Sequence, residues 1–304
     1  MSPFAEVVLL ASDGSGESDR AARMAVELSR NLGSELHVIQ VAPLPSPYAS
    51  PESVVIDPEY REKIRTRTKE VVDAKLEREI RRLREVGGEV TGTHAAIGRP
   101  DAEIVRHAEE LAAGLIVLGS RGLGPLRRAV MGSVSTSVVR HAHGSVLVVR
   151  GDPGEDGYLS GRVLLATDGS REAEAASRVA SEISARAGSE LHVMFALQTK
   201  EKPPYNHPMM GEGWTESLEQ AKHEARGFVD ERANRIEEEG VTVKDAHLAF
   251  GAPAEEIAKL GEELEAGLIV LGSRGLGGVR RALMGSVSDS VVRHAHGPVL
   301  VVRE

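Results

Sequence analysis

The sequence predicts an α/β protein made of two tandem copies of one domain, each a doubly wound, Rossmann-like, five-stranded parallel sheet. Three observations predict it. The chain has 304 residues, enough for two domains. Its two halves repeat each other, and within each half short aliphatic runs alternate with helical periodicities, the pattern of βαβ units. Aromatic residues make up only 3% of the chain, so the core must be aliphatic, as in sheets covered by helices on both faces.

The repeat runs from end to end. The segment AAGLIVLGSRGLGPLRRAVMGSVSTSVVRHAHGSVLVVR ends at Arg150, and EAGLIVLGSRGLGGVRRALMGSVSDSVVRHAHGPVLVVR ends at Arg303. Self-similarity on this scale indicates a duplicated structural unit. The glycine, proline and acidic content of GDPGEDGYLSG predicts a linker at 151–161, between a first domain at 1–150 and a second at 162–304.

Five strands are expected in each half, joined by right-handed crossovers. In the first half they are residues 7–12, 36–42, 90–96, 115–119 and 145–150, with a helix after each of the first four. The charged stretches 59–86 and 216–239 predict surface helices. The apolar stripe of the first helix and its C-terminal glycine cap are, in the two halves, Ala21, Ala25, Leu28, Leu32 and Gly33, and Ala176, Ala180, Ile183, Ala187 and Gly188.

Composition excludes several classes of function. The net charge is -9 and no basic run exceeds a pair such as Arg127-Arg128, so non-specific nucleic-acid binding is not expected. The chain has no cysteine, which excludes disulfides, thiolate catalysis and cysteine-ligated zinc. The N-terminus lacks the pattern of a signal peptide, and the longest apolar runs are strand-sized. We therefore expect a cytoplasmic protein without a membrane partner.

The candidate site follows the fourth strand. There the sequence reads Gly-Ser-Arg-Gly at 119–122, then nine residues, then Gly132-Ser133, and the second half repeats this at 272–275 and 285–286. Glycine lets an anion approach the backbone, and unpaired amides with the helix dipole stabilise it. The hydroxyls of Ser133 and Ser135 are expected to add donors. Taken alone, the same residues also suit an ordinary turn and a helix cap.

This spacing resembles the signature of the ATP-binding branch of the universal stress protein family, and both halves match it over almost the whole chain. The resemblance implies one adenine nucleotide per domain, ATP with or without Mg²⁺. It also implies an aspartate near the ribose or the phosphates, although a turn aspartate fits equally well, and adenine contacts after the second strand. The expected contact residues are Ala11, Ser12, Asp13, Val41, Leu118, Gly119, Arg121, Gly122, Gly132, Ser133, Val134 and Ser135, and Ala166, Thr167, Asp168, Ala196, Leu271, Gly272, Arg274, Gly275, Gly285, Ser286, Val287 and Ser288.

Three other features have open interpretations. The repeated HAHG offers His141 with His143 and His294 with His296, but two histidines without a further ligand favour structure or surface over a metal site. The arginine pairs 127–128 and 280–281 either reach a triphosphate or are exposed charges. The proline-bearing segments 43–58 and 198–214 either cover a ligand, contact a partner or are ordinary divergent loops.

The leading functional hypothesis is a stress-response or regulatory protein that acts as a nucleotide-dependent sensor or conformational switch. One alternative is a slow Mg²⁺-dependent ATPase, although the chain has no GxxxxGK[ST] motif and no recognisable catalytic set. Another is an interaction module that binds a different nucleotide such as AMP. The family resemblance further implies that the last strands, SVLVVR and PVLVVR, pair within the chain as an internal pseudo-dimer, with further homodimerisation allowed.

Overall fold

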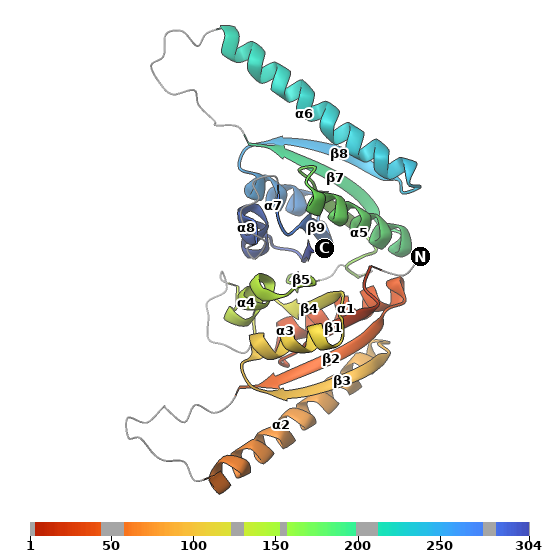
Figure 1. Ribbon diagram of the computed structural model, residues 1–304. Helices are drawn as coiled ribbons and strands as arrows, with labels where there is room; N and C mark the ends of the chain where they lie inside the picture. Colours follow the sequence, from red (N-terminus) through yellow and green to blue (C-terminus); the bar gives the residue numbers. More distant parts are fainter. Residues whose placement is uncertain are drawn as a thin grey trace, which may run out of the picture. The chain divides into compact units, whose positions relative to one another are not determined.

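The computed structural model describes residues 4–43, 58–122, 131–152, 157–198, 212–275 and 284–303 (Figure 1). The chain forms two compact units, Met1–Arg150 and Gly151–Glu304. No helix in these described ranges is long and apolar enough to cross a membrane.

Unit 1 is a five-stranded parallel sheet with strand order β3-β2-β1-β4-β5. Helices α1 and α2 contact each other on one face of the sheet, and α3 and α4 contact each other on the opposite face (Figure 1). Its elements are β1 (Val7–Ala11), α1 (Gly16–Leu32), β2 (Glu35–Ala42), α2 (Pro58–Glu85), β3 (Val90–Ile97), α3 (Pro100–Glu110), β4 (Leu115–Gly119), α4 (Ser133–His141) and β5 (Ser145–Val149).

Unit 2 repeats this arrangement, with strand order β8-β7-β6-β9-β10 and the same parallel pairings. Helices α5 and α6 correspond to α1 and α2, and α7 and α8 correspond to α3 and α4. Its elements are β6 (Arg162–Ala166), α5 (Arg171–Ala187), β7 (Glu190–Leu197), α6 (Glu212–Glu238), β8 (Val243–Phe250), α7 (Pro253–Glu263), β9 (Leu268–Gly272), α8 (Ser286–His294) and β10 (Val299–Val302).

The predicted α/β class and doubly wound order are confirmed. The alanine-rich stripe of α1 is buried, with Ala21 and Ala25 at 0% exposure, so the helix lies close to the sheet. Gly33 ends α1 with φ +71°, and Gly188 ends α5 with φ +73°, the left-handed conformation that favours glycine at a helix C-cap. The strands agree with the prediction to within one residue at each end.

The segment expected to be a linker contains two buried residues. Tyr158 and Leu159 are 2% and 1% exposed, and the Tyr158 hydroxyl donates to the carbonyl of Gly151 at 2.9 Å. The Leu159 carbonyl accepts from the hydroxyl of Ser189 in the same unit. These residues pack before β6 as part of unit 2, because their apolar side chains lose water-exposed surface there.

A histidine pair joins the second and third strands of each unit. His37 Nδ1 and His94 Nε2 lie 3.0 Å apart in unit 1, and His192 Nδ1 and His247 Nε2 lie 3.0 Å apart in unit 2. Burial first, and the neighbouring histidine second, lower the pKa of His94 and of His192. The folded protein therefore favours neutral rings at these positions.

Acid is expected to destabilise both units through these histidines. Because folding lowers the pKa of His94 and His192 below the ordinary value of 6.5, the unfolded chain takes up protons more readily as the pH falls through that value. Their contribution to the free energy of unfolding is complete above about pH 6.5 and is progressively lost below it. Thermal unfolding between about pH 8 and about pH 5 should show a smaller fall in Tm for His94→Gln and His192→Gln than for the wild type.

His223→Gln is the matched control for this prediction, since His223 lies exposed on α6 and outside the pairs. It should keep the wild-type dependence of Tm on pH. If His94→Gln and His192→Gln also keep that dependence, the buried pairs do not cause it.

Candidate nucleotide-binding site

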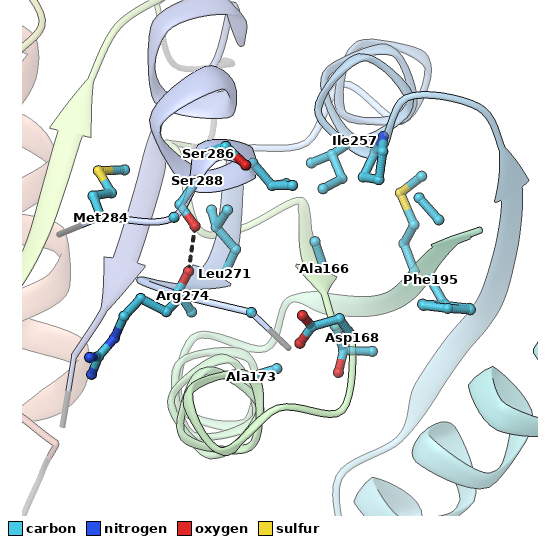
Figure 2. Close-up of a pocket in the computed structure, with 18 residues that line it drawn as sticks. Ala166, Asp168, Ala173, Phe195, Ile257, Leu271, Arg274, Met284, Ser286 and Ser288 are labelled. Carbon is cyan, nitrogen blue, oxygen red and sulfur yellow. Dashed lines mark hydrogen bonds between the residues drawn. The ribbon is translucent and has the colours of Figure 1, made fainter. Parts of the chain in front are cut away.

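A pocket opens in each unit at the carboxyl ends of the strands, where the order reverses between the first and fourth strands. Ligands of open α/β sheets bind at such points. The pocket of unit 1 has a volume of about 1010 Å³ and that of unit 2 about 460 Å³. All twelve residues expected to contact nucleotide in each half line the pocket of their own unit; Figure 2 shows the pocket of unit 2.

The N-terminus of α4 faces this pocket without a side-chain cap. Gly132 takes the N-cap position with φ -65° and ψ 153°, and no side chain caps the amides that follow. By contrast, the Ser15 hydroxyl caps α1 by accepting from the amide of Ser18 at 3.2 Å. In unit 2, Gly285 and Ser170 repeat the contrast between α8 and α5. The fourth helix of each unit, rather than the first, therefore presents its dipole and amides to an anion.

Glycine stands at each of the three signature positions of unit 1 for a different structural reason. A Cβ on Gly119 would lie 2.8 Å from the backbone carbon of Glu17, so glycine lets α1 approach β4. A Cβ on Gly122 would lie 2.2 Å from Asp13 Oδ2. A Cβ on Gly132 would meet nothing closer than 3.4 Å, so packing does not demand glycine there. Glycine at 132 instead leaves the backbone open to the pocket.

Asp13 forms the turn that the sequence allowed, and its second oxygen lies against the glycine loop. Its Oδ1 accepts from the amide of Ser15 at 3.0 Å and from the hydroxyl of Ser18 at 2.6 Å. Asp168 accepts only the first of these bonds, from Ser170 at 3.0 Å, because Ala173 occupies the place of Ser18. Asp168 therefore lacks the equivalent of the bond between Asp13 and the Ser18 hydroxyl.

The signature arginines are bound to the first helix. Arg121 donates to Glu17 Oε1 at 2.9 Å, and Arg274 lies 2.8 Å from Glu172 Oε1. Each arginine side chain is about 30% exposed. These pairs fasten the loop after the fourth strand to the first helix.

The serines of the fourth helix divide their roles. Ser135 donates to the carbonyl of Gly119 at 2.8 Å, and Ser288 donates to Gly272 at 2.7 Å, the dashed line in Figure 2. A hydroxyl has one hydrogen, so neither is free to donate to a ligand as the sequence suggested. Ser133 is exposed at the start of α4 and remains available.

Sequence reasoning missed the apolar walls. In unit 1, Pro100 and Ile104 of α3 line the pocket, and in unit 2 Pro253 and Ile257 of α7 do so (Figure 2). A repeated signal was present, because a glycine, one residue and a proline open this helix in both halves, at 98–100 and 251–253. These residues give each pocket a surface suited to the faces of a heteroaromatic ring.

Glu79 of α2 is a second feature that the sequence concealed, since it lies in a charged run. It is 3% exposed, and burial raises the pKa of its carboxyl, while a hydrogen bond with Ser12 and the charge of Arg82 oppose this. Arg82 also pairs with Asp19 of α1. In unit 2 the corresponding position of α6 carries Arg232, so the charge behind the first loop is reversed.

The remaining candidates separate from the pocket or fall outside the described residues. His141 Nδ1 donates to the carbonyl of Ser137 at 2.8 Å, and His143 pairs with Glu109 at 2.7 Å, so the two rings have different partners. The described residues contain no group of three potential metal ligands. The arginine pairs 127–128 and 280–281, and nearly all of segments 43–58 and 198–214, lie outside the described residues.

The family model of the universal stress protein family matches residues 5–150 and 160–303, and the chain belongs to this family. A universal stress protein of Mycolicibacterium smegmatis is 36% identical over 194 residues, which span 63% of this chain and 62% of that protein. One from Mycobacterium tuberculosis is 32% identical over 198 residues, spanning 62% and 61%. The alignments thus cover less than two thirds of either relative.

Solved structures share the fold. A universal stress protein from Archaeoglobus fulgidus has a TM-score of 0.68 at 24% identity, covering 99% of this chain and 97% of its own. One from Pseudomonas aeruginosa has a TM-score of 0.67 at 19% identity, covering 98% and 93%. At these identities the likeness shows the fold.

Gly122→Ala is expected to displace Asp13 and loosen the first loop. The new methyl would clash with Oδ2, so the carboxylate must shift, which strains the bonds that Oδ1 accepts from Ser15 and Ser18. The cost is about 1–3 kcal/mol for the domain. Hydrogen exchange measured by mass spectrometry should show faster exchange of the amides of residues 13–18.

Gly275→Ala should cost less than Gly122→Ala, by about 1 kcal/mol, because Ala173 stands in place of Ser18 and Asp168 has no such hydroxyl bond to lose. Gly132→Ala is the matched control, since its methyl has room, and it should leave exchange at residues 13–18 unchanged. Wild-type exchange in Gly122→Ala would show that this contact does not hold the loop.

Proposed function

We propose that each domain binds one adenine nucleotide, ATP with or without Mg²⁺, and that the protein acts as a nucleotide-dependent regulator in a stress response. The observation that carries the proposal is the convergence, in both units, of the twelve expected contact residues on a pocket beside an uncapped helix N-terminus. The family resemblance supplies the adenine nucleotide as the ligand class.

The phosphates are assigned to the loop at 119–122 and the start of α4. Amides and the positive end of the helix dipole stabilise negative charge there, and Gly132 leaves space for close approach. Ser133 is exposed to add its hydroxyl. The corresponding residues of the second domain are those at 272–275 and the start of α8.

The ribose is assigned to Asp13 and Asp168. A carboxylate accepts hydrogen bonds from hydroxyl groups, which favours the sugar at this point. The base then lies beside Val41, between the end of β2 and the apolar pair Pro100 and Ile104. In the second domain Ala196, Pro253 and Ile257 take these places.

Binding, rather than rapid turnover, is the proposed activity. Hydrolysis needs a group that orients or deprotonates the attacking water. Among the described residues, Asp13 already holds the amide and hydroxyl of its own loop, and Glu17 is paired with Arg121. A ligand that binds only the folded form would stabilise it by about 2.7 kcal/mol at one hundred times its Kd.

Isothermal titration of nucleotide-free protein with ATP and Mg²⁺ should show about two sites per chain. Gly132→Glu should abolish the first site and Gly285→Glu the second, because the side chain brings bulk and negative charge to the phosphate position. Gly132→Ala, whose methyl has room in the fold, should remain folded and weaken the first site about tenfold through lost backbone approach.

Gly161→Glu is the matched control, since a Cβ there meets nothing within 4 Å. It should bind like the wild type. Absence of ATP binding to the folded wild-type protein would overturn the proposal and leave the interaction-module alternative. Pairing of the two domains through their last strands stays a prediction.

A further inference from the structure

The two pockets share their signature residues but differ in extent. Additional residues of the first helix and of α2 line the pocket of unit 1, together with Gln40 of β2. No residue of α6 lines the pocket of unit 2 in the described part of the chain. We call the added space the side chamber; its walls include Ser18, Arg20, Gln40, Val71, Val72 and Lys75, and Glu17 lines the same pocket.

Two aromatic rings occupy the corresponding positions in unit 2. The repeats GSELHVIQV and GSELHVMFA align Gln40 with Phe195, and the helix registers align Lys75 with Phe228. The helix alignment is supported by matching buried positions, which are Leu76 and Leu83 in α2 and Val229 and Ile236 in α6. The Phe195 and Phe228 ring centroids lie 4.8 Å apart at 58°, a tilted aromatic pair.

The space around the loop after β1 differs from the space around the loop after β6. Gly14 and Gly169 have the same backbone, with φ +78° and +76°. A Cβ on Gly14 would meet nothing within 4 Å, whereas one on Gly169 would lie 2.9 Å from the Phe228 ring. The space over this loop is therefore open in unit 1 and filled in unit 2.

In unit 2, Arg232 packs against the ring of Phe228, one of the two aromatic residues beside the pocket. The Arg232 guanidinium lies 5.2 Å from the Phe228 ring centroid and pairs with Glu174 of α5 at 3.0 Å. A cation over a ring and an ion pair to a second helix oppose rotation of the ring out of the site. Phe195, at the right of the pocket in Figure 2, is the other aromatic residue.

The side chamber offers a cation, an amide and an apolar surface. Lys75 is exposed and makes no ion pair within the described residues. Arg20 adds a second cation, which is paired with Glu17 at 3.2 Å. Val71 is 51% exposed, and Val72 lies beside it in the wall. An anionic group on a compact organic ligand fits this combination.

We propose that the side chamber is a subsite of domain 1 for an additional phosphate carried on the ribose of an adenine nucleotide, and that Phe195 and Phe228 exclude this phosphate from domain 2. The inference rests on the proposed function, which places the ribose at Asp13, and Asp13 lines the same pocket as the side-chamber residues. Lys75 contacts the added phosphate and Gln40 donates to it. Domain 1 thereby distinguishes ribose-phosphorylated nucleotides from ordinary ones.

The test compares ADP with adenosine 3′-phosphate 5′-diphosphate by isothermal titration of the full chain. ADP should bind at about two sites, and the 3′-phosphorylated nucleotide at about one, with at least about tenfold tighter binding to domain 1 than to domain 2. Gln40→Phe with Lys75→Phe should abolish binding of the 3′-phosphorylated nucleotide and keep both ADP sites. Phe195→Gln with Phe228→Lys should create a second site for it.

Lys75→Gln separates charge from volume, since it keeps the chamber open. It should weaken binding of the 3′-phosphorylated nucleotide about threefold to tenfold and leave ADP unchanged. Equal binding of the 3′-phosphorylated nucleotide at two sites, or its full retention after Gln40→Phe with Lys75→Phe, would overturn the side-chamber proposal alone. Absence of ADP and ATP binding at both sites would overturn the proposed function and the subsite together.

Discussion

In each unit the backbone at the start of the first helix lies against the last residue of the fourth strand, so closely that a Cβ on Gly119 would come within 2.8 Å of Glu17. This contact brings two loops from non-adjacent parts of the chain to one edge of the sheet. The pair between Glu17 and Arg121 and the contact between Asp13 and Gly122 both depend on it. In unit 2 the distance is 2.7 Å, with Gly272 against Glu172. The site is therefore first a consequence of how a helix packs on a strand.

The fold could be predicted from the sequence because the hydrophobic periodicity and the internal repeat indicate the same arrangement of helices and strands. Burial of Ala21 and Ala25, and the left-handed caps at Gly33 and Gly188, follow from local patterns that depend on few tertiary details. The proximity of the signature positions could also be predicted, since the carboxyl ends of parallel strands meet at one edge of the sheet. Burial of Tyr158 and Leu159 was not foreseen, because turn-like composition hid two apolar residues that belong to the core of unit 2.

What the sequence could not give were the partners of individual side chains. The hydroxyl of Ser135 could serve a ligand or a backbone carbonyl, and only the fold shows that Gly119 receives it. The motif likewise does not distinguish its glycines, although Gly119 and Gly122 are needed for packing and Gly132 is not. Glu79 carried no signal at all, since one acid in a charged helix looks like any solvated residue until its burial is known.

The two units share the backbone features of the pocket and differ in the side chains that surround it. Amides, glycine spacing and helix termini form the cradle, so substitution there is constrained by geometry in both domains. The walls facing α2 and α6 are free of that constraint, because a lysine or a phenylalanine can occupy the same helical position without altering the strand ends. Under the proposed function, a duplicated domain can keep one mode of binding phosphates while its two pockets come to admit different ligands. Two sites with different ligand specificities respond to different nucleotides, whereas two identical sites would respond to the same nucleotide.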